Sequence, residues 1–286
     1  MFASLSGLHS LADRYDVLLS DVWGVIHNGA ESFEVPCAAL ARWRAEVGPV
    51  VLISNSPRPS PIVHEQLDGL GVPRESWTEL VTSGDATRTL LTQRLPGPAY
   101  RIGPDRDWTL YEGLGLGFTD LANAAFIACT GPRDDDVETP EDYRGELTEA
   151  AARGLTMICA NPDKVVQRGA RLVYCGGALA ELYEQLGGAV EMAGKPHAPI
   201  YQESLTRAAH HLGRIVDPGR VLCIGDGIAT DLAGAQAQGL DALFIAAGIH
   251  AAEAVDLEGR FDPHAARELL QRHGAQAAWI AEDLIW

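Results

Sequence analysis

The stretch LLSDVWGVIHNG, residues 18–29, decides the fold of this chain. An apolar run, Val17-Leu18-Leu19, leads to the carboxylate of Asp21, and another largely apolar run follows. A short continuous apolar run is typical of a strand that is buried on both faces of a parallel sheet. Ligands of such sheets bind beyond the carboxyl ends of the strands. The sequence therefore predicts that Asp21 is a nucleophile or a metal ligand.

The same pattern recurs throughout the chain. Eight further apolar runs, each closed by a small or polar residue, predict strands over residues 50–55, 79–84, 99–103, 124–131, 155–163, 171–177, 220–227 and 242–248. Helical patterns lie between most of them, over residues 36–48, 60–71, 85–95, 139–154 and 230–239. Several begin with Ser, Thr, Asp or Pro and end at Gly, as helix caps do. This alternation predicts an α/β fold whose parallel sheets are covered by helices on both faces.

Composition limits the classes of function. The 286 residues exceed one average domain, so we expect two domains or one domain with a large insertion. The formal net charge of −17 argues against sequence-independent binding of nucleic acid or anionic membranes. No apolar run approaches the roughly 20 residues that a membrane-spanning helix needs. We expect a cytoplasmic protein without nucleic-acid or membrane partners.

The five cysteines, at positions 37, 129, 159, 175 and 223, have no CxxC spacing. This arrangement predicts buried thiols in a reducing compartment, and neither a disulfide framework nor a zinc site.

Four pieces of sequence carry chemistry. They are Asp21, the LISNS segment with Ser54 and Asn55, the GKP segment with Lys195, and GDGIATD with Asp226 and Asp231. Each piece has an ordinary structural explanation when it is considered alone, such as a turn residue, a helix cap or a surface lysine. Three of the four follow apolar strands directly, and this order indicates a single site.

The order DxxGV, SN, GKP and GDGxxTD resembles the haloacid dehalogenase-like hydrolase superfamily, and more narrowly its subclass IIA of nucleotide-phosphatase-like and p-nitrophenyl-phosphatase-like proteins. The segments GVIHNG, TSGDAT, ANPD, CGGAL and GKPHAPIY are typical of that subclass. The resemblance runs from about residue 16 to about residue 248. It implies a Rossmann-like three-layer core with a parallel sheet, formed by residues 1–83 and 191–286, and an inserted smaller α/β cap over residues 84–190.

The resemblance also implies a reaction. The chain is expected to be a Mg²⁺-dependent phosphatase of a small phosphorylated metabolite that forms an aspartyl-phosphate on Asp21. The resemblance implies that Mg²⁺ is held by Asp21, the Trp23 backbone carbonyl and Asp226, with Asp231 behind them or linked through water. It implies that the phosphoryl group is bound by Ser54, Asn55 and Lys195, of which Lys195 also has a catalytic role. It implies that the substrate is met by Asn161, Asp163 and Arg58.

Trp23 departs from the family pattern, which has a second aspartate at this position. Tryptophan still offers a backbone carbonyl to a metal, but its indole cannot act as the proton carrier. Loss of a general acid–base typically lowers a rate by about 10²–10⁴-fold. The sequence thus predicts a weakened or specialised hydrolase, which could take a proton from His27 or from the substrate.

Other functions stay open. Trp23 favours a non-catalytic phosphate-ligand sensor or partner-binding protein that keeps the fold and the metal site. A dinucleotide-binding dehydrogenase is disfavoured, because Thr230 replaces the third glycine and Asp226 would face the pyrophosphate. Haloacid dehalogenases have an aromatic residue at the position of Trp23 but use no metal, and the retained pair Asp226 and Asp231 argues against that reaction. The tail AAWIAEDLIW, residues 277–286, either packs on the core or contributes to a homodimer contact.

Overall fold

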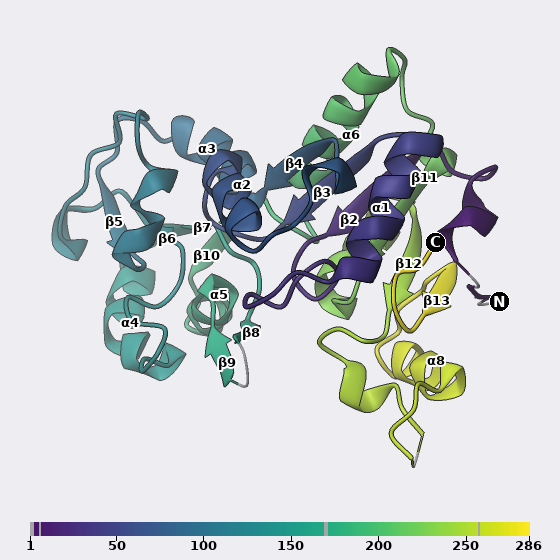
Figure 1. Ribbon diagram of the computed structural model, residues 1–286. Coiled ribbons are helices and arrows are strands. Elements are labelled where there is room, and N and C mark those ends of the chain that lie inside the picture. The colour runs from purple at the N-terminus through teal and green to yellow at the C-terminus, as the bar shows by residue number, and fades with distance from the viewer. Residues whose placement is uncertain (1–2, 6, 169–170, 257) are drawn as a thin grey trace. The chain divides into compact units, whose positions relative to one another are not determined.

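The computed structural model describes residues 3–5, 7–168, 171–256 and 258–286, which divide into two compact units (Figure 1). The first unit comprises Met1–Ser54, His64–Val81 and Tyr201–Trp286. The second comprises Asn55–Val63 and Thr82–Ile200. The chain therefore passes between the units four times, and the interval 84–190 lies within the second unit.

A seven-stranded sheet forms the centre of the first unit, in the order β1-β13-β12-β11-β2-β3-β4. Its strands are β1 (Ala3–Ser4), β2 (Val17–Asp21), β3 (Val50–Ser54), β4 (Glu79–Thr82), β11 (Val221–Gly225), β12 (Asp241–Ile245) and β13 (Trp279–Ala281). The strand β2 lies between β11 and β3 and is parallel to both. Every residue of β2 and β11 is buried, because neither face of the sheet is open to solvent at its centre.

Helices flank this sheet (Figure 1). They are α1 (Glu34–Glu46), α2 (Ser60–Gly69), α6 (Ala198–Leu212), α7 (Ala233–Ala237) and α8 (Pro263–Arg272), of which α2 and α6 run from one unit into the other. The helix α1 contacts β3, α7 contacts β12 and α8 contacts β13. This Rossmann-like arrangement of a parallel sheet and flanking helices confirms the predicted fold class.

The second unit has its own parallel sheet of four strands, in the order β10-β7-β6-β5. Its elements are α3 (Ser83–Thr92), β5 (Ala99–Ile102), β6 (Phe126–Cys129), α4 (Arg144–Ala152), β7 (Thr156–Cys159), β8 (Val165–Arg168), β9 (Arg171–Tyr174), α5 (Gly176–Gln185) and β10 (Ala189–Met192). Alternate residues of β6 point into different hydrophobic clusters: Ile127 lies in one with residues of α4 and α5, and Phe126 lies in the other with Leu91 of α3. Both faces of this sheet are thus covered.

The start of α3 shows how the sequence specifies local structure. The hydroxyl of Thr82 accepts a hydrogen bond from the Asp85 N–H at 3.0 Å, and the Asp85 carboxylate accepts one from the Thr82 N–H at 3.2 Å. This reciprocal capping box satisfies two donors at the helix start. It ends β4 and begins α3 within the TSGDAT segment.

One predicted strand forms, but not in a parallel sheet. Residues 171–177 do not enter a parallel sheet: Arg171–Tyr174 is the second strand of an antiparallel hairpin with Val165–Arg168. The remainder begins α5, and Gly177 lies where a Cβ would come well inside 3.0 Å of the Pro162 carbonyl oxygen. The apolar run was too short to distinguish an exposed hairpin strand from a buried one.

The tail packs on the first unit. Trp279 belongs to β13, and its indole N–H donates a hydrogen bond to the Tyr15 hydroxyl at 3.0 Å. The Arg42 guanidinium lies 4.7 Å from the ring centre of Trp286. Packing on the core is therefore the structural role of this segment, and the homodimer contact stays a prediction.

All five cysteines are buried and form no disulfide, as predicted. Among the described residues, no helix has the length and apolar character needed to cross a membrane.

Candidate active site

Three carboxylates converge at the carboxyl edge of the first unit's sheet. Asp21 is the last residue of β2, Asp226 directly follows β11, and Asp231 lies in a π-helical turn, Ile228–Leu232, that begins two residues later. The strands β2 and β11 are neighbours, so Asp21 and Asp226 are brought together by the sheet itself. One oxygen of each carboxylate lies within 4.8 Å of the others, and all three residues are at least 90% buried.

Backbone donors hold each of these carboxylates. The Val22 N–H donates to Asp21 Oδ1 at 2.7 Å, and the Gly227 N–H donates to Asp231 Oδ2 at 3.1 Å. The Ile249 N–H, from the loop after β12, donates to Asp226 Oδ2 at 2.7 Å. Fixed main-chain donors leave these side chains little rotational freedom, so the group is preorganised.

This donor set fits Mg²⁺. Three buried carboxylates within 4.8 Å repel one another, and a divalent cation relieves that repulsion. Mg²⁺ takes hard oxygen ligands in an octahedron and usually retains several waters. Two or three carboxylates and one backbone carbonyl are therefore enough ligands from the protein.

A second acidic group, Asp134, Asp135 and Asp136, lies in the second unit. Asp135 forms ion pairs of 2.5 Å with both Arg106 and Arg168. Burial acts to raise the pKa of its carboxyl, but the two arginines together outweigh burial and hold that pKa below the usual range. This cluster is therefore explained as a surface ion-pair network.

Trp23 is packed against its own turn. Its half-buried indole meets the His27 imidazole edge-on, with ring centroids 5.0 Å apart and an interplanar angle of 70°. Its six-membered ring lies beside Gly29, so close that a Cβ at Gly29 would come within 3.0 Å of it. The Gly24 N–H donates to the His27 carbonyl at 2.8 Å and closes the turn. The side chain at this position is thus a fixed apolar group.

His27 is neutral in this setting. It is 2% exposed, and burial lowers the pKa of its imidazole to about 4. The Gly29 N–H donates to its Nδ1 at 2.9 Å, which places the proton of the neutral ring on Nε2.

Ser54 lies at the same sheet edge as Asp21. It is the last residue of β3, and the residue before it, Ile53, is the register partner of Asp21. The sheet therefore places the Ser54 side chain one residue beyond the carboxylate on the neighbouring strand.

Four predicted residues meet in the second unit. The Asn55 side chain donates to Asp163 Oδ1 at 2.8 Å and to the Lys195 carbonyl at 3.1 Å, and it accepts the Lys195 N–H at 2.7 Å. The Asn161 side chain accepts the Asp163 N–H at 3.1 Å. A side chain at Gly194 would collide with Asn55 Oδ1, which explains the glycine of the GKP segment. Asn55 and Lys195 are 4% and 3% exposed.

Arg58 lies among charges of the second unit. Burial lowers the pKa of its guanidinium, whereas the nearby Asp107 carboxylate acts in the opposite direction. Asp107 is 3% exposed, and its own pKa is raised by that burial.

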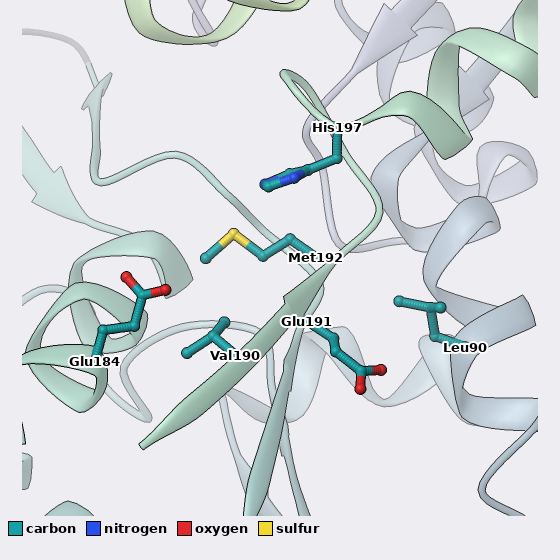
Figure 2. Close-up of a pocket in the computed structure, with 6 residues that line it drawn as sticks. All are labelled: Leu90, Glu184, Val190, Glu191, Met192 and His197. Atoms are coloured by element: carbon teal, nitrogen blue, oxygen red, sulfur yellow. The ribbon is translucent and has the colours of Figure 1, made fainter. Parts of the chain in front are cut away.

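The second unit also has a cavity of about 560 Å³ beside β10 (Figure 2). Val190 and Met192 project from one side of this edge strand, and Glu191 projects from the other, beside Leu90. Glu184 and His197 complete the lining. The residues predicted from sequence are not among these six.

The sequence did not indicate two groups beside Asp226: the Ile249 N–H, which donates to it, and Gly248, where a Cβ would come well inside 3.0 Å of Asp226 Oδ2. The signal was available, because the apolar run 242–248 also ends at the carboxyl edge of the sheet. That run closes with small residues, which offer no side-chain ligand or nucleophile and so do not indicate a site.

Comparisons with known proteins agree with this arrangement. A family model described as haloacid dehalogenase-like hydrolase matches residues 18–117, and a second, described as HAD-hydrolase-like, matches residues 192–284. A crystal structure of a hydrolase of the haloacid dehalogenase-like family from Brucella suis 1330 is 44% identical, covers 98% of this chain and 100% of its own, and superposes with a TM-score of 0.88.

Two curated relatives are more distant. Chronophin from Rattus norvegicus is 27% identical over 87% of this chain and 82% of its own length. D-glycerol 3-phosphate phosphatase from Mycobacterium tuberculosis (strain ATCC 25618 / H37Rv) is 24% identical over 86% of this chain and 67% of its own length.

Proposed function

Because the chain belongs to the haloacid dehalogenase-like hydrolase family, we propose that it is a Mg²⁺-dependent phosphatase acting on a small phosphorylated metabolite. The convergence of Asp21, Asp226 and Asp231 within 4.8 Å carries this proposal. The phosphatase named among the relatives supports the choice of reaction.

Asp21 is the proposed nucleophile. One of its oxygens attacks the phosphorus atom, and the bond from phosphorus to the leaving oxygen breaks as the aspartyl-phosphate forms. Water then attacks the same phosphorus atom, which releases phosphate and restores the carboxylate. The Val22 N–H on Oδ1 orients the carboxylate for this attack.

Asp21, the Trp23 backbone carbonyl and Asp226 are proposed to hold Mg²⁺, with Asp231 behind them or linked through water. When bound, Mg²⁺ neutralises the charge that would otherwise keep a carboxylate and a phosphoryl group apart. Ser54, the Asn55 N–H and Lys195 are proposed to bind the phosphoryl oxygens. The second unit would act as the cap, with Asn161, Asp163 and Arg58 selecting the leaving group.

Proton transfer is the step that this chain performs differently. The Trp23 indole can neither protonate the leaving oxygen nor accept a proton from the attacking water. Neutral His27 offers only the weakly acidic N–H of an imidazole. We propose that water or the substrate itself supplies the first proton and that solvent takes the second. Substrates whose leaving oxygen departs without protonation should then react fastest.

A non-catalytic sensor of phosphorylated ligands is the second candidate, and Trp23 is the observation that favours it. Phosphate release from a panel of phosphorylated metabolites, measured with Mg²⁺ and with EDTA, separates the two. We expect Mg²⁺-dependent release that Asp21→Asn lowers by at least about 10³-fold, because the nucleophile is lost. Asp13→Asn removes an exposed carboxylate near the same strand and is the matched control. Absence of release from every substrate by a folded wild-type chain would favour the sensor.

A further inference from the structure

The carboxylate of Asp226 is enclosed by backbone. Its Oδ2 accepts the Ile249 N–H at 2.7 Å. A Cβ at Gly24 would lie well inside 3.0 Å of the same oxygen, and so would a Cβ at Gly248. Two glycines and one main-chain donor therefore surround Oδ2. The contact with Gly24, whose φ is +83°, comes from the turn that also carries Trp23.

The loop that supplies Gly248 and Ile249 is itself held. The Ala246 N–H donates to the Ala281 carbonyl and the Ala247 N–H to the Glu282 carbonyl, both at 2.9 Å. These bonds extend the pairing of β12 with β13 beyond the strands. The Gly248 carbonyl accepts the Ala251 N–H at 3.0 Å. The Ile249 N–H is thus fixed in direction by the sheet and does not depend on the Ile249 side chain, which is 44% exposed.

We propose that Gly248 and the Ile249 N–H are positioning groups that choose the metal-facing oxygen of Asp226. They keep Oδ2 against the protein backbone, so that Oδ1 is the oxygen that faces the cation. Without them the carboxylate could rotate or bind the cation through both oxygens, which the near-ideal octahedral geometry of Mg²⁺ disfavours. This inference rests on the cation site of the proposed function and does not require that the chain turn over any substrate.

Gly248→Ala tests the inference. The added carbon would collide with the Cβ of Asp226 as well as with Oδ2, so rotation of the carboxylate alone cannot relieve the contact. We expect the Kd for Mg²⁺, measured by titration calorimetry on the full chain, to rise at least tenfold. Gly69→Ala is the matched control, because it adds a carbon in α2 where no atom lies within 4 Å. This control should bind Mg²⁺ within twofold of the wild-type chain.

Hydrogen exchange on the wild-type chain gives a second measurement that needs no variant. The Ile249 amide should exchange slowly with and without Mg²⁺, whereas an amide that exchanges at the rate of an exposed loop would overturn the assignment. A Gly248→Ala chain with wild-type Kd would also overturn it, even if phosphate release is observed. Weakened Mg²⁺ binding in that variant supports the inference even if the chain releases no phosphate from any substrate.

Discussion

The indole of Trp23, two residues beyond Asp21, and the imidazole of His27 meet edge to face, with ring centroids 5.0 Å apart. A short parallel bridge between the two residues and the Gly24 N–H bond to the His27 carbonyl hold this pair. Position 23 is thus occupied by an apolar group that its own turn keeps in place.

Trp23→Asp should raise phosphate release by about 10²–10⁴-fold, because it restores a proton carrier while the backbone carbonyl stays. Steady-state rates on several phosphorylated substrates measure this gain, which should be largest for poor leaving groups. Trp23→Asn is the matched control, since Asn has the same size as Asp but no ionisable proton. An equal gain in the Asn variant would mean that removal of the indole, and not proton transfer, is responsible.

His27 should make the stability of the chain depend on pH. Burial lowers its pKa to about 4 in the folded chain from an ordinary value of 6.5, so the unfolded chain binds more protons between these values. The contribution of neutral His27 to the free energy of unfolding is therefore present above pH 6.5 and is lost as pH falls toward 4. Between pH 7 and pH 5 we expect a loss of about 2 kcal/mol. Urea unfolding in EDTA measures it.

His27→Asn is the control for that experiment, because Asn keeps an acceptor for the Gly29 N–H but does not titrate. The difference in stability between the two chains should shrink as pH falls. A difference that stays constant from pH 7 to pH 5 would contradict the neutral, buried state of His27.

Asn55→Asp should destabilise the second unit. The substitution replaces a donor by a carboxylate beside Asp163 Oδ1, which the Asn55 amide contacts at 2.8 Å, and removes the bond to the Lys195 carbonyl. A buried unpaired charge costs about 3–5 kcal/mol. Asp163→Asn added to this variant should recover part of the loss, since it restores one donor to the pair.

The chain offers a surface version of the same pair for comparison. The Asn123 amide donates to Asp120 Oδ1 at 2.8 Å, and both residues are exposed. Asn123→Asp should cost below about 1 kcal/mol, because solvent screens the two charges. Equal costs at the two positions, measured by thermal unfolding, would show that the Asn55 contact is not buried in solution.

Mg²⁺ should stabilise the folded chain. At a concentration 100 times its Kd, a ligand of the folded state alone adds about 2.7 kcal/mol to the free energy of unfolding. Asp226→Asn should abolish this gain because it removes one of the three converging carboxylates. Asp13→Asn should retain it. Replacing Mg²⁺ by Ca²⁺ tests the coordination geometry of this site, since Ca²⁺ accepts more ligands at longer distances than Mg²⁺ does.

The central strands and their carboxylates could be predicted from sequence because burial on both faces requires uninterrupted apolar runs. Asp21 and Asp226 end such runs, and the structure brings them together. The edge strand β10 could not be predicted in this way, since Ala189–Met192 is exposed or half-buried and contains Glu191. The antiparallel pairing of β9 with β8 could not be predicted for a similar reason: Arg171, Leu172 and Tyr174 are exposed, and only Val173 of β9 is buried.

The contacts of Asn55 were also beyond sequence reasoning. A serine–asparagine pair after a strand indicates a site, but the amide partners, Asp163 and Lys195, are more than 100 positions away. Nothing local encodes such a bond, because it depends on how the second unit folds.

The pairing of β11 with β2 has a consequence for synthesis. Asp21 and Asp226 lie about 200 residues apart in the chain, so a ribosome that adds about 5–20 residues per second needs roughly 10–40 s between them. During that interval a nascent chain can contain Asp21, Ser54 and the complete second unit while lacking two of the three carboxylates. An emerging chain therefore has only one of the three converging carboxylates until Asp226 and Asp231 have been added.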